Sequence, residues 1–170
     1  AQSTCLCGPD HFVRYWMHNG ILTVNGEKMS KSLGNFLTVQ DLLAQAPGET
    51  IRLSLLSTHY RQPLHWNDDT LNQSQNALDR LYTALKDYKP VNPIIHEDVL
   101  KALSEDLNTP LAIHHLHHLA SLIHQAQNPQ DKQNRQDELF GSGQFLGLFS
   151  LNTTQWFQRN VDLIPEDIEN

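Results

Sequence analysis

The one clear β pattern in this sequence is short, and it is surrounded by residues that favour helices. Residues 21–24 are rich in β-branched side chains, and Asn25-Gly26 directly after them is a strong signal for a two-residue hairpin turn. The chain then turns back through residues 27–29. Because two strands are too few to form a stable sheet, we expect them to complete one whose other strands lie upstream of Ala1. The pattern predicts a mainly α protein, with a short β and loop tip followed by an α-helical bundle.

Helices separated by proline and glycine account for most of the remaining sequence. Apolar residues at helical spacing predict helices over residues 11–19, 39–46, 49–60, 67–86, 96–106, 110–127 and 130–140. Thr38, Asn67 and Asn108 stand where helix-capping side chains are typical. Residues 61–64 are expected to be a linker. Three glycines interrupt the helical pattern near the end of the chain: Gly141, Gly143 and Gly147.

Charge is spread unevenly along the chain. Residues 1–89 carry eight basic and eight acidic side chains, whereas residues 90–170 carry four basic and eleven acidic ones, which gives the whole net charge of −7. This balance excludes a generic basic nucleic-acid binder, and an anionic partner is expected to bind the first half. No segment approaches the roughly 18 apolar residues of a membrane span. The two cysteines cannot form a disulfide framework, so a reducing, cytoplasmic setting is expected.

Both ends of the sequence indicate a segment of a longer protein. The chain begins at Ala1 without a starting methionine, a basic region or an apolar signal segment. Its last residues, 166–170, resemble the first turn of a helix. We therefore expect a chain that is truncated on both sides.

Residues 28–32 have the sequence KMSKS and stand in a small, polar segment directly after the second expected strand. Lys28 and Lys31 would bring two ammonium charges to one short loop, where each can follow a moving phosphate as a point charge. Gly34 lets such a loop hinge, because glycine adopts backbone conformations closed to other residues. The pattern suits a reaction in which negative charge builds on phosphate oxygens. Such a reaction is catalysed mainly by positive charges that stabilise the phosphate and by correct positioning of the reactants.

KMSKS matches, at all five positions, the nucleotide-binding signature of class I aminoacyl-tRNA synthetases. The flanking sequences resemble the cysteinyl-tRNA synthetase family at residues 11–20, 32–39, 59–61 (His-Tyr-Arg) and 107–110 (Leu-Asn-Thr-Pro). The resemblance extends from Ala1 to about Phe149. It implies that residues 1–40 end a class I nucleotide-binding domain, that 41–90 are helices contacting the tRNA stem, and that 91–170 are a helical bundle truncated before an anticodon-reading domain.

The same resemblance implies a ligase that activates L-cysteine with ATP and Mg²⁺ and transfers it to tRNA(Cys), as a cytoplasmic monomer. Lys31 and Lys28 would be the catalytic cations on the ATP phosphates, and the other residues of KMSKS, Met29, Ser30 and Ser32, would complete this side of the ATP site. The family's HIGH signature does not occur in the sequence. The family's zinc ligands are expected upstream of Ala1, so the chain alone is expected to be inactive.

Four residues are candidates for tRNA contacts. Arg61 belongs to the His-Tyr-Arg match and is expected at a helix-to-linker junction. Arg52, together with Arg80, lies on or beside the helices that would flank a tRNA stem, although surface ion pairs are the alternative for both. Trp66 stands between two expected helices and could stack on a base. The other tryptophans, Trp16 and Trp156, are expected in the core.

Two clusters of metal-ligating side chains do not predict a metal site. Cys5 and Cys7 with His11 lack the spacing and the second ligand pair of a structural zinc site. Five histidines share one expected helix: His114, His115, His117, His118 and His124. The apolar face of that helix includes Leu116 and Leu119, so His114, His117 and His118 are expected on the opposite, solvated face. We expect no metal in this chain.

Two alternative functions stay open from the sequence. A related ligase that couples cysteine to a glucosaminyl-inositol in mycothiol synthesis shares the loop and the bundle but does not use tRNA. A free-standing, non-catalytic RNA-binding helical module is the second alternative. Such a module would have a complete fold within residues 1–170, whereas a truncated synthetase predicts an unpaired sheet edge at residues 20–29.

Overall fold

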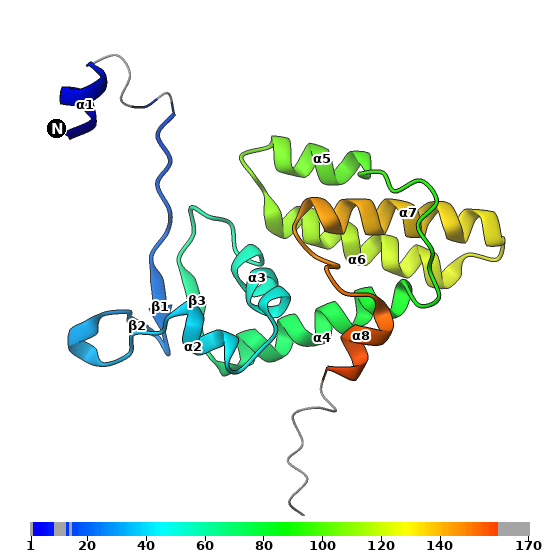
Figure 1. Ribbon diagram of the computed structural model, residues 1–170, viewed down its shortest axis with the longest axis horizontal. Helices are drawn as coiled ribbons and strands as arrows, with labels where there is room; N and C mark the ends of the chain where they lie inside the picture. Colours follow the sequence, from blue (N-terminus) through cyan, green and yellow to red (C-terminus); the bar gives the residue numbers. More distant parts are fainter. Residues whose placement is uncertain (1, 9–12, 14, 160–170) are drawn as a thin grey trace, which may run out of the picture.

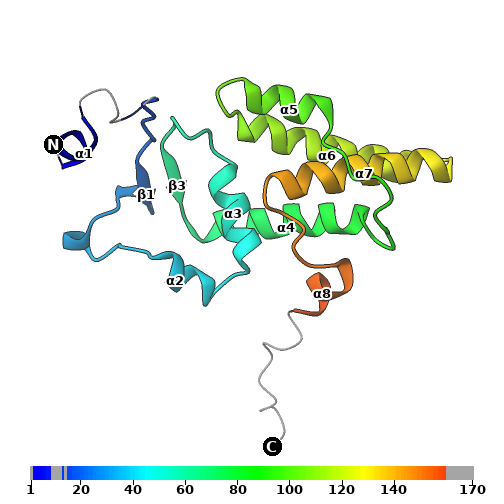
Figure 2. The ribbon, with the colours of Figure 1, turned by 45° about the horizontal axis from the view of Figure 1, so that its top comes forward.

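A small sheet and a helical bundle make up the protein, as shown by a computed structural model that describes residues 2–8, 13 and 15–159. The helices and strands follow in the order α1 (Gln2–Cys7), β1 (Leu22–Val24), β2 (Glu27–Lys28), a 3₁₀ helix (Lys31–Leu33), α2 (Val39–Leu43), α3 (Gly48–Leu56), β3 (Leu64–Trp66), α4 (Asp68–Ala84), α5 (Glu97–Ser104), α6 (Thr109–Gln125), α7 (Pro129–Phe145) and α8 (Thr153–Gln158). The predicted fold class, mainly α with a short β tip, is confirmed. Figures 1 and 2 both show α3 between the sheet and the bundle.

The sheet contains the predicted hairpin and a third strand that the sequence did not indicate. Its strand order is β2-β1-β3. Asn25 and Gly26 both have positive φ angles, 52° and 86°, as the hairpin turn requires. β3 pairs in parallel with β1, with Leu22 opposite Leu64. The linker expected over residues 61–64 is therefore wrong at Leu64, which begins β3. A strand this short is stabilised by pairing with its neighbour rather than by its own sequence.

The expected helix over residues 11–19 is wrong at the positions that the structure describes. Residue 13 and residues 15–19 have no regular structure, while 11, 12 and 14 lie outside the described residues, as do 166–170. Trp16 is 69% exposed, so it does not pack in the core as expected. Tyr15 and Trp16 of the predicted apolar face are largely exposed, whereas most short helices are stabilised by burying such a face in tertiary packing.

Gly20 shows why the chain is extended at this point. Its N–H donates a hydrogen bond to the Tyr60 carbonyl at 2.7 Å. A Cβ atom at this position would overlap the carbonyl of Gln62, so only glycine permits this close approach of two backbones. The contact leads directly into the pairing of β1 with β3.

The predicted helix starts at Thr38, Asn67 and Asn108 are confirmed. Each side chain accepts a hydrogen bond from a backbone N–H in the first turn of its helix, α2, α4 or α6. The expected break at Gly141 and Gly143 is wrong, because α7 continues through both glycines. Both lie where another part of the chain packs closely, so they serve packing rather than termination.

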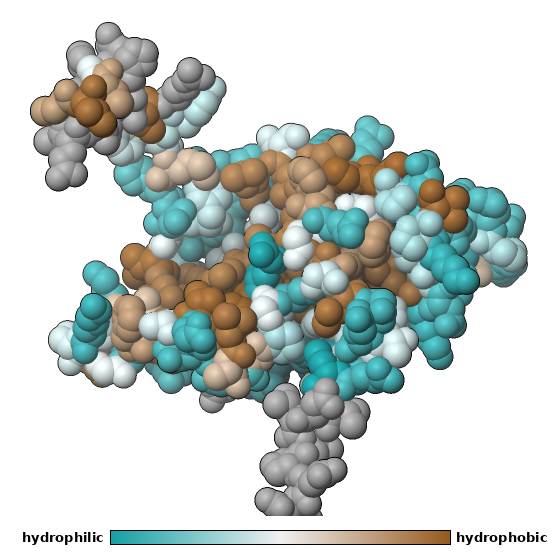
Figure 3. Space-filling view, in the orientation of Figure 1, coloured by the Kyte–Doolittle hydropathy of each residue, from teal (hydrophilic) through white to brown (hydrophobic). Residues whose placement is uncertain are grey.

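Two clusters of buried side chains form the core. The larger cluster fills the bundle and includes Trp156, which is buried as expected. The smaller cluster joins the sheet to α2 and α3 through Val24, Leu42, Ile51 and Trp66. Hydrophobic residues remain on the surface around α2 and the small sheet (Figure 3).

We expect Gly143→Ala to destabilise the protein by about 1–3 kcal/mol, because a Cβ there would overlap the ring of Phe149 inside the bundle core. Gly48→Ala is the control, since its Cβ would meet only a Leu43 methyl at an ordinary 3.6 Å. Urea unfolding of both variants measures the difference. Equal stability of the two variants would contradict the close packing of Gly143.

Candidate functional site

The KMSKS segment forms a short loop that is closed by its own hydrogen bonds. Ser30 caps the 3₁₀ helix over Lys31–Leu33, and its hydroxyl oxygen accepts a hydrogen bond from the Leu33 N–H at 3.3 Å. Gly34 ends this helix with a φ of 68°, in the left-handed region that glycine adopts easily. The loop predicted from the sequence therefore contains one turn of helix.

Asn35 fastens the two ends of the loop together. Its Oδ1 accepts a hydrogen bond from the Ser30 N–H at 2.9 Å, and its Nδ2 donates to the Lys28 carbonyl at 3.3 Å. Sequence reasoning missed this residue, because it lies outside the KMSKS letters. The sequence did hold a signal for it: Asn35 directly follows Gly34, and asparagine side chains often bond to nearby backbone groups in turns.

The loop presents two cations. Lys28 and Lys31 are both exposed, and neither forms an ion pair within the described residues. The Lys31 ammonium lies 5.6 Å from the centre of the Phe36 ring, a cation–π contact that holds the side chain beside the loop. Met29 packs against the smaller core and anchors the loop between the two lysines.

A second cluster joins two segments that are far apart in the sequence. The Asp106 carboxylate accepts hydrogen bonds from the Tyr60 hydroxyl at 2.7 Å and from Arg61 Nε at 2.7 Å. The ring of His59 lies 3.0 Å from the Asp106 carbonyl through Nε2. The His-Tyr-Arg segment thus contacts the residue that directly precedes the Leu-Asn-Thr-Pro segment.

This cluster stabilises a charged carboxylate on an unusual turn. The hydrogen bond from Arg61, followed by that from Tyr60, lowers the pKa of Asp106 below its ordinary value. The same contact with Asp106 raises the pKa of the Tyr60 hydroxyl. Asp106 and Leu107 both have φ of 54°, a region that non-glycine residues rarely adopt. The contacts to Asp106 hold this turn in place.

Arg61, Arg52 and Trp66, which were expected to contact tRNA, have different surroundings. Arg61 is exposed but bound to Asp106, and its guanidinium lies over the Tyr60 ring. Arg52 is exposed on α3, and its guanidinium lies beside Gly147. Trp66 is only 5% exposed and packs in the smaller core, so this ring is not presented for stacking on a base.

The potential metal ligands do not converge. In the described part of the chain, no group of three or more His, Cys, Asp or Glu side chains is placed to hold a metal ion. Cys5 and Cys7 are exposed thiols, and His11 lies outside the described residues.

The histidine-rich helix is α6, and its apolar face is buried as predicted. His114 and His118 are exposed, in agreement with the sequence, but His117 is half-buried against α4 rather than fully solvated. The helical pattern could not show this, because the neighbouring helix that covers His117 is set by tertiary packing.

Comparison with known proteins matches both parts of the chain. Residues 1–76 match the family model of the class I (C) tRNA synthetase catalytic domain, and residues 98–150 match that of the DALR domain. The chain is 53% identical over 163 residues to the cysteine–tRNA ligase of Paramagnetospirillum magneticum, covering 93% of this chain and 35% of the relative. It is 48% identical over 159 residues to that of Rhodospirillum rubrum, with coverages of 92% and 35%. The chain thus spans about a third of the length of these curated relatives.

None of the helices in the described residues combines the length and the apolar character needed to cross a membrane.

We expect Asp106→Asn to lower the melting temperature at pH 7 by about 1–3 °C, since it weakens exposed charged contacts to Arg61 and Tyr60. Because folding lowers the pKa of Asp106, its stabilising effect is present above the ordinary value of 3.8 and is lost as the pH falls through the lowered value. The difference between the variant and the unaltered protein should therefore disappear at low pH.

Glu105→Gln is the matched control, because this neighbouring carboxylate is exposed and its side chain forms no ion pair within the described residues. Thermal unfolding followed by circular dichroism between pH 7 and pH 2.5 makes the comparison. A pH-independent difference for Asp106→Asn would show that the charge of Asp106 is not what stabilises the turn.

Proposed function

Because the chain belongs to the cysteinyl-tRNA synthetase family of class I, we propose that it supplies the phosphate-clamping side of an ATP site. The complete enzyme would activate L-cysteine and transfer it to tRNA(Cys) in the cytoplasm. The observation that carries the proposal is the closed loop at residues 28–35, which holds two exposed lysines without ion-pair partners in the described residues. The name shared by the relatives, cysteine–tRNA ligase, supports tRNA rather than a sugar amine as the acceptor.

The proposed reaction needs positive charge at the leaving group. The cysteine carboxylate attacks the α-phosphate of ATP, a new oxygen–phosphorus bond forms, and the bond to pyrophosphate breaks. Negative charge then moves onto the pyrophosphate oxygens. Lys31 and Lys28 would stabilise this charge, and Asn35 would position both by keeping the loop closed. The hydroxyls of Ser30 and Ser32, which lie 3.3 Å apart, would offer hydrogen bonds to the same phosphates.

The KMSKS loop itself would not bind the metal ions of the complete enzyme. Residues 28–36 offer hydroxyls, an amide and ammonium groups but no carboxylate, so Mg²⁺ would be held by the ATP phosphates rather than by this loop. Zinc is proposed for the complete protein only, because the described residues do not bring three suitable ligands together. Aminoacylation would accordingly need residues beyond this chain, and we propose that the chain alone is inactive.

We expect Lys31→Ala in the complete protein to slow adenylate formation by about 10- to 100-fold while changing the KM for cysteine little, because charge grows on phosphate only in the transition state. ATP–pyrophosphate exchange measures this rate. Lys101→Ala, which removes an exposed lysine from α5, is the control. An unchanged exchange rate in Lys31→Ala would reject the proposed role of the loop.

We further propose that Arg61 contacts a backbone phosphate of the tRNA stem, with Arg52 on the preceding helix as a second contact. In the structure Arg61 is paired with Asp106, so a phosphate would compete with that carboxylate for the guanidinium. Arg61→Glu should weaken tRNA binding by about three- to tenfold at low salt and less at high salt.

Asp106→Asn separates a phosphate contact from a structural one, because it frees Arg61 while leaving its charge in place. If Arg61 binds phosphate, Asp106→Asn retains or strengthens tRNA binding. If both variants weaken binding equally, Arg61 acts only by holding the turn at Asp106. Filter binding of tRNA at two salt concentrations distinguishes these results.

A further inference from the structure

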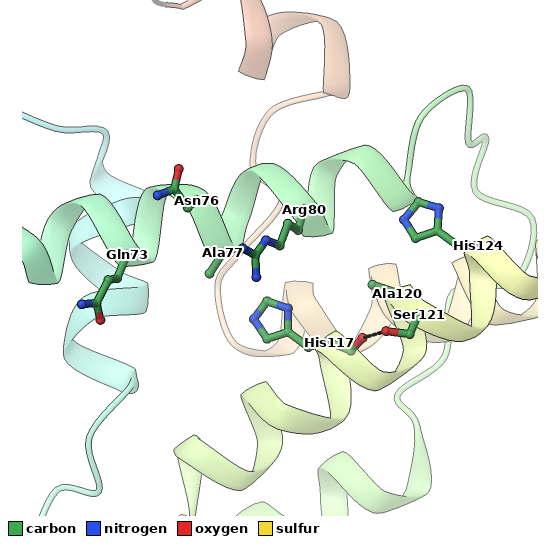
Figure 4. A pocket seen from close by; sticks show the side chains of 8 residues that line it. All are labelled: Gln73, Asn76, Ala77, Arg80, His117, Ala120, Ser121 and His124. Carbon is green, nitrogen blue, oxygen red and sulfur yellow. Dashed lines mark hydrogen bonds between the residues drawn. The ribbon is translucent and has the colours of Figure 1, made fainter.

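A groove with a volume of about 490 Å³ lies between α4 and α6, away from the KMSKS loop. Gln73, Asn76 and Arg80 line it from α4, and His117, Ser121 and His124 line it from α6. Figure 4 shows the side chains of Arg80 and His117 directed toward one another across the groove. No carboxylate is among the lining residues.

The guanidinium of Arg80 is the dominant charge in this groove. Arg80 is exposed and forms no ion pair within the described residues. The half-buried ring of His117 faces it across the groove. Burial, and then the charge of Arg80, lower the pKa of His117. An anion between these two side chains would therefore meet two nitrogen donors and no competing carboxylate.

The neutral groups around Arg80 suit an anion with several oxygens. The amides of Gln73 and Asn76 can each donate hydrogen bonds from the α4 side. The hydroxyl of Ser121 is already used, since it donates to the His117 carbonyl at 3.1 Å. Arginine matches a phosphate better than a spherical anion, because its planar fork can bind two oxygens at once.

Positive charge continues beyond this groove. An adjoining hollow shares His124 and is also lined by Lys86 and Lys132, with Asp87 as its one carboxylate. Arg80 and the two lysines thus line neighbouring hollows beside α4, in a chain whose net charge is −7. An open, extended row of cations fits successive phosphates of a polymer better than a single small ion.

We propose that the groove between α4 and α6 is a phosphate-binding site in which Arg80 is the main contact and His117 and His124 flank it. The ligand it fits best is a backbone phosphate of an RNA. That the phosphate belongs to an RNA rests on the proposed function, whereas the phosphate site itself rests only on the residues that line the groove. Inorganic phosphate would bind through the same contacts, so inorganic phosphate and RNA are tested separately.

The first measurement titrates inorganic phosphate into the protein and follows the imidazole NMR signals of His117 and His124. We expect both signals to shift, and Arg80→Gln to weaken the binding of phosphate by about tenfold through loss of one charge-assisted contact. Lys101→Gln is the matched control, because it removes one exposed positive charge from α5. Signals that do not respond, or equal responses in the two variants, would overturn the site.

The second measurement uses tRNA and the complete protein. Arg80→Gln should lower the affinity for tRNA. It should also make the slope of log K against log salt concentration shallower by about one, whereas Lys101→Gln should change neither. Unchanged tRNA binding together with a phosphate response would overturn the RNA source and leave a small phosphate as the ligand. Pyrophosphate exchange by the unaltered enzyme is measured in parallel. Its absence would reject the proposed function without affecting the phosphate result.

Discussion

One buried carboxylate, that of Glu49, joins the two parts of this protein. Glu49 lies in the first turn of α3 and is 8% exposed. It accepts hydrogen bonds from the Tyr82 hydroxyl at 2.9 Å and from the backbone N–H groups of Phe149 and Ser150 at 3.1 and 2.6 Å. The helix dipole favours a negative charge at this end of α3. The Ser150 hydroxyl donates to it as well, so loss of the carboxylate would leave four donors without their acceptor. Leaving buried donors unpaired costs more free energy than the hydrogen bonds contribute on balance.

The other end of α3 is held by a second carboxylate, which gives the helix a fixed position. Residues 59–61 follow α3 and contact Asp106, which lies just before α6. α3 also shares the smaller core with the sheet through Ile51. The KMSKS loop extends from that sheet, and the groove lined by Arg80 lies in the bundle. The two carboxylates therefore help to hold the part of the protein that carries the loop, which we propose binds ATP, against the bundle that carries the groove, which we propose binds RNA.

Local sequence information was sufficient for the features that depend on nearby residues. The hairpin turn at Asn25-Gly26 and the caps at Thr38, Asn67 and Asn108 are formed within a few residues, so their patterns predicted them correctly. The position of the KMSKS loop after a strand was predicted for the same reason. The helix expected over residues 11–19 failed because an apolar stripe specifies a helix only where another surface covers it.

The sequence alone determined the turn, the helix caps and the two lysines of the loop, because each depends on side chains and backbone groups within one or two turns. Only the tertiary structure decided the rest. β3 exists because β1 lies beside it, Gly143 is required because Phe149 packs on it, and the pKa of Asp106 is lowered because Arg61 reaches its carboxylate. The groove at Arg80 likewise forms only where α4 meets α6. These features depend on partners 6 to 45 residues away, and the spacing of residues along a chain does not specify which distant surfaces meet.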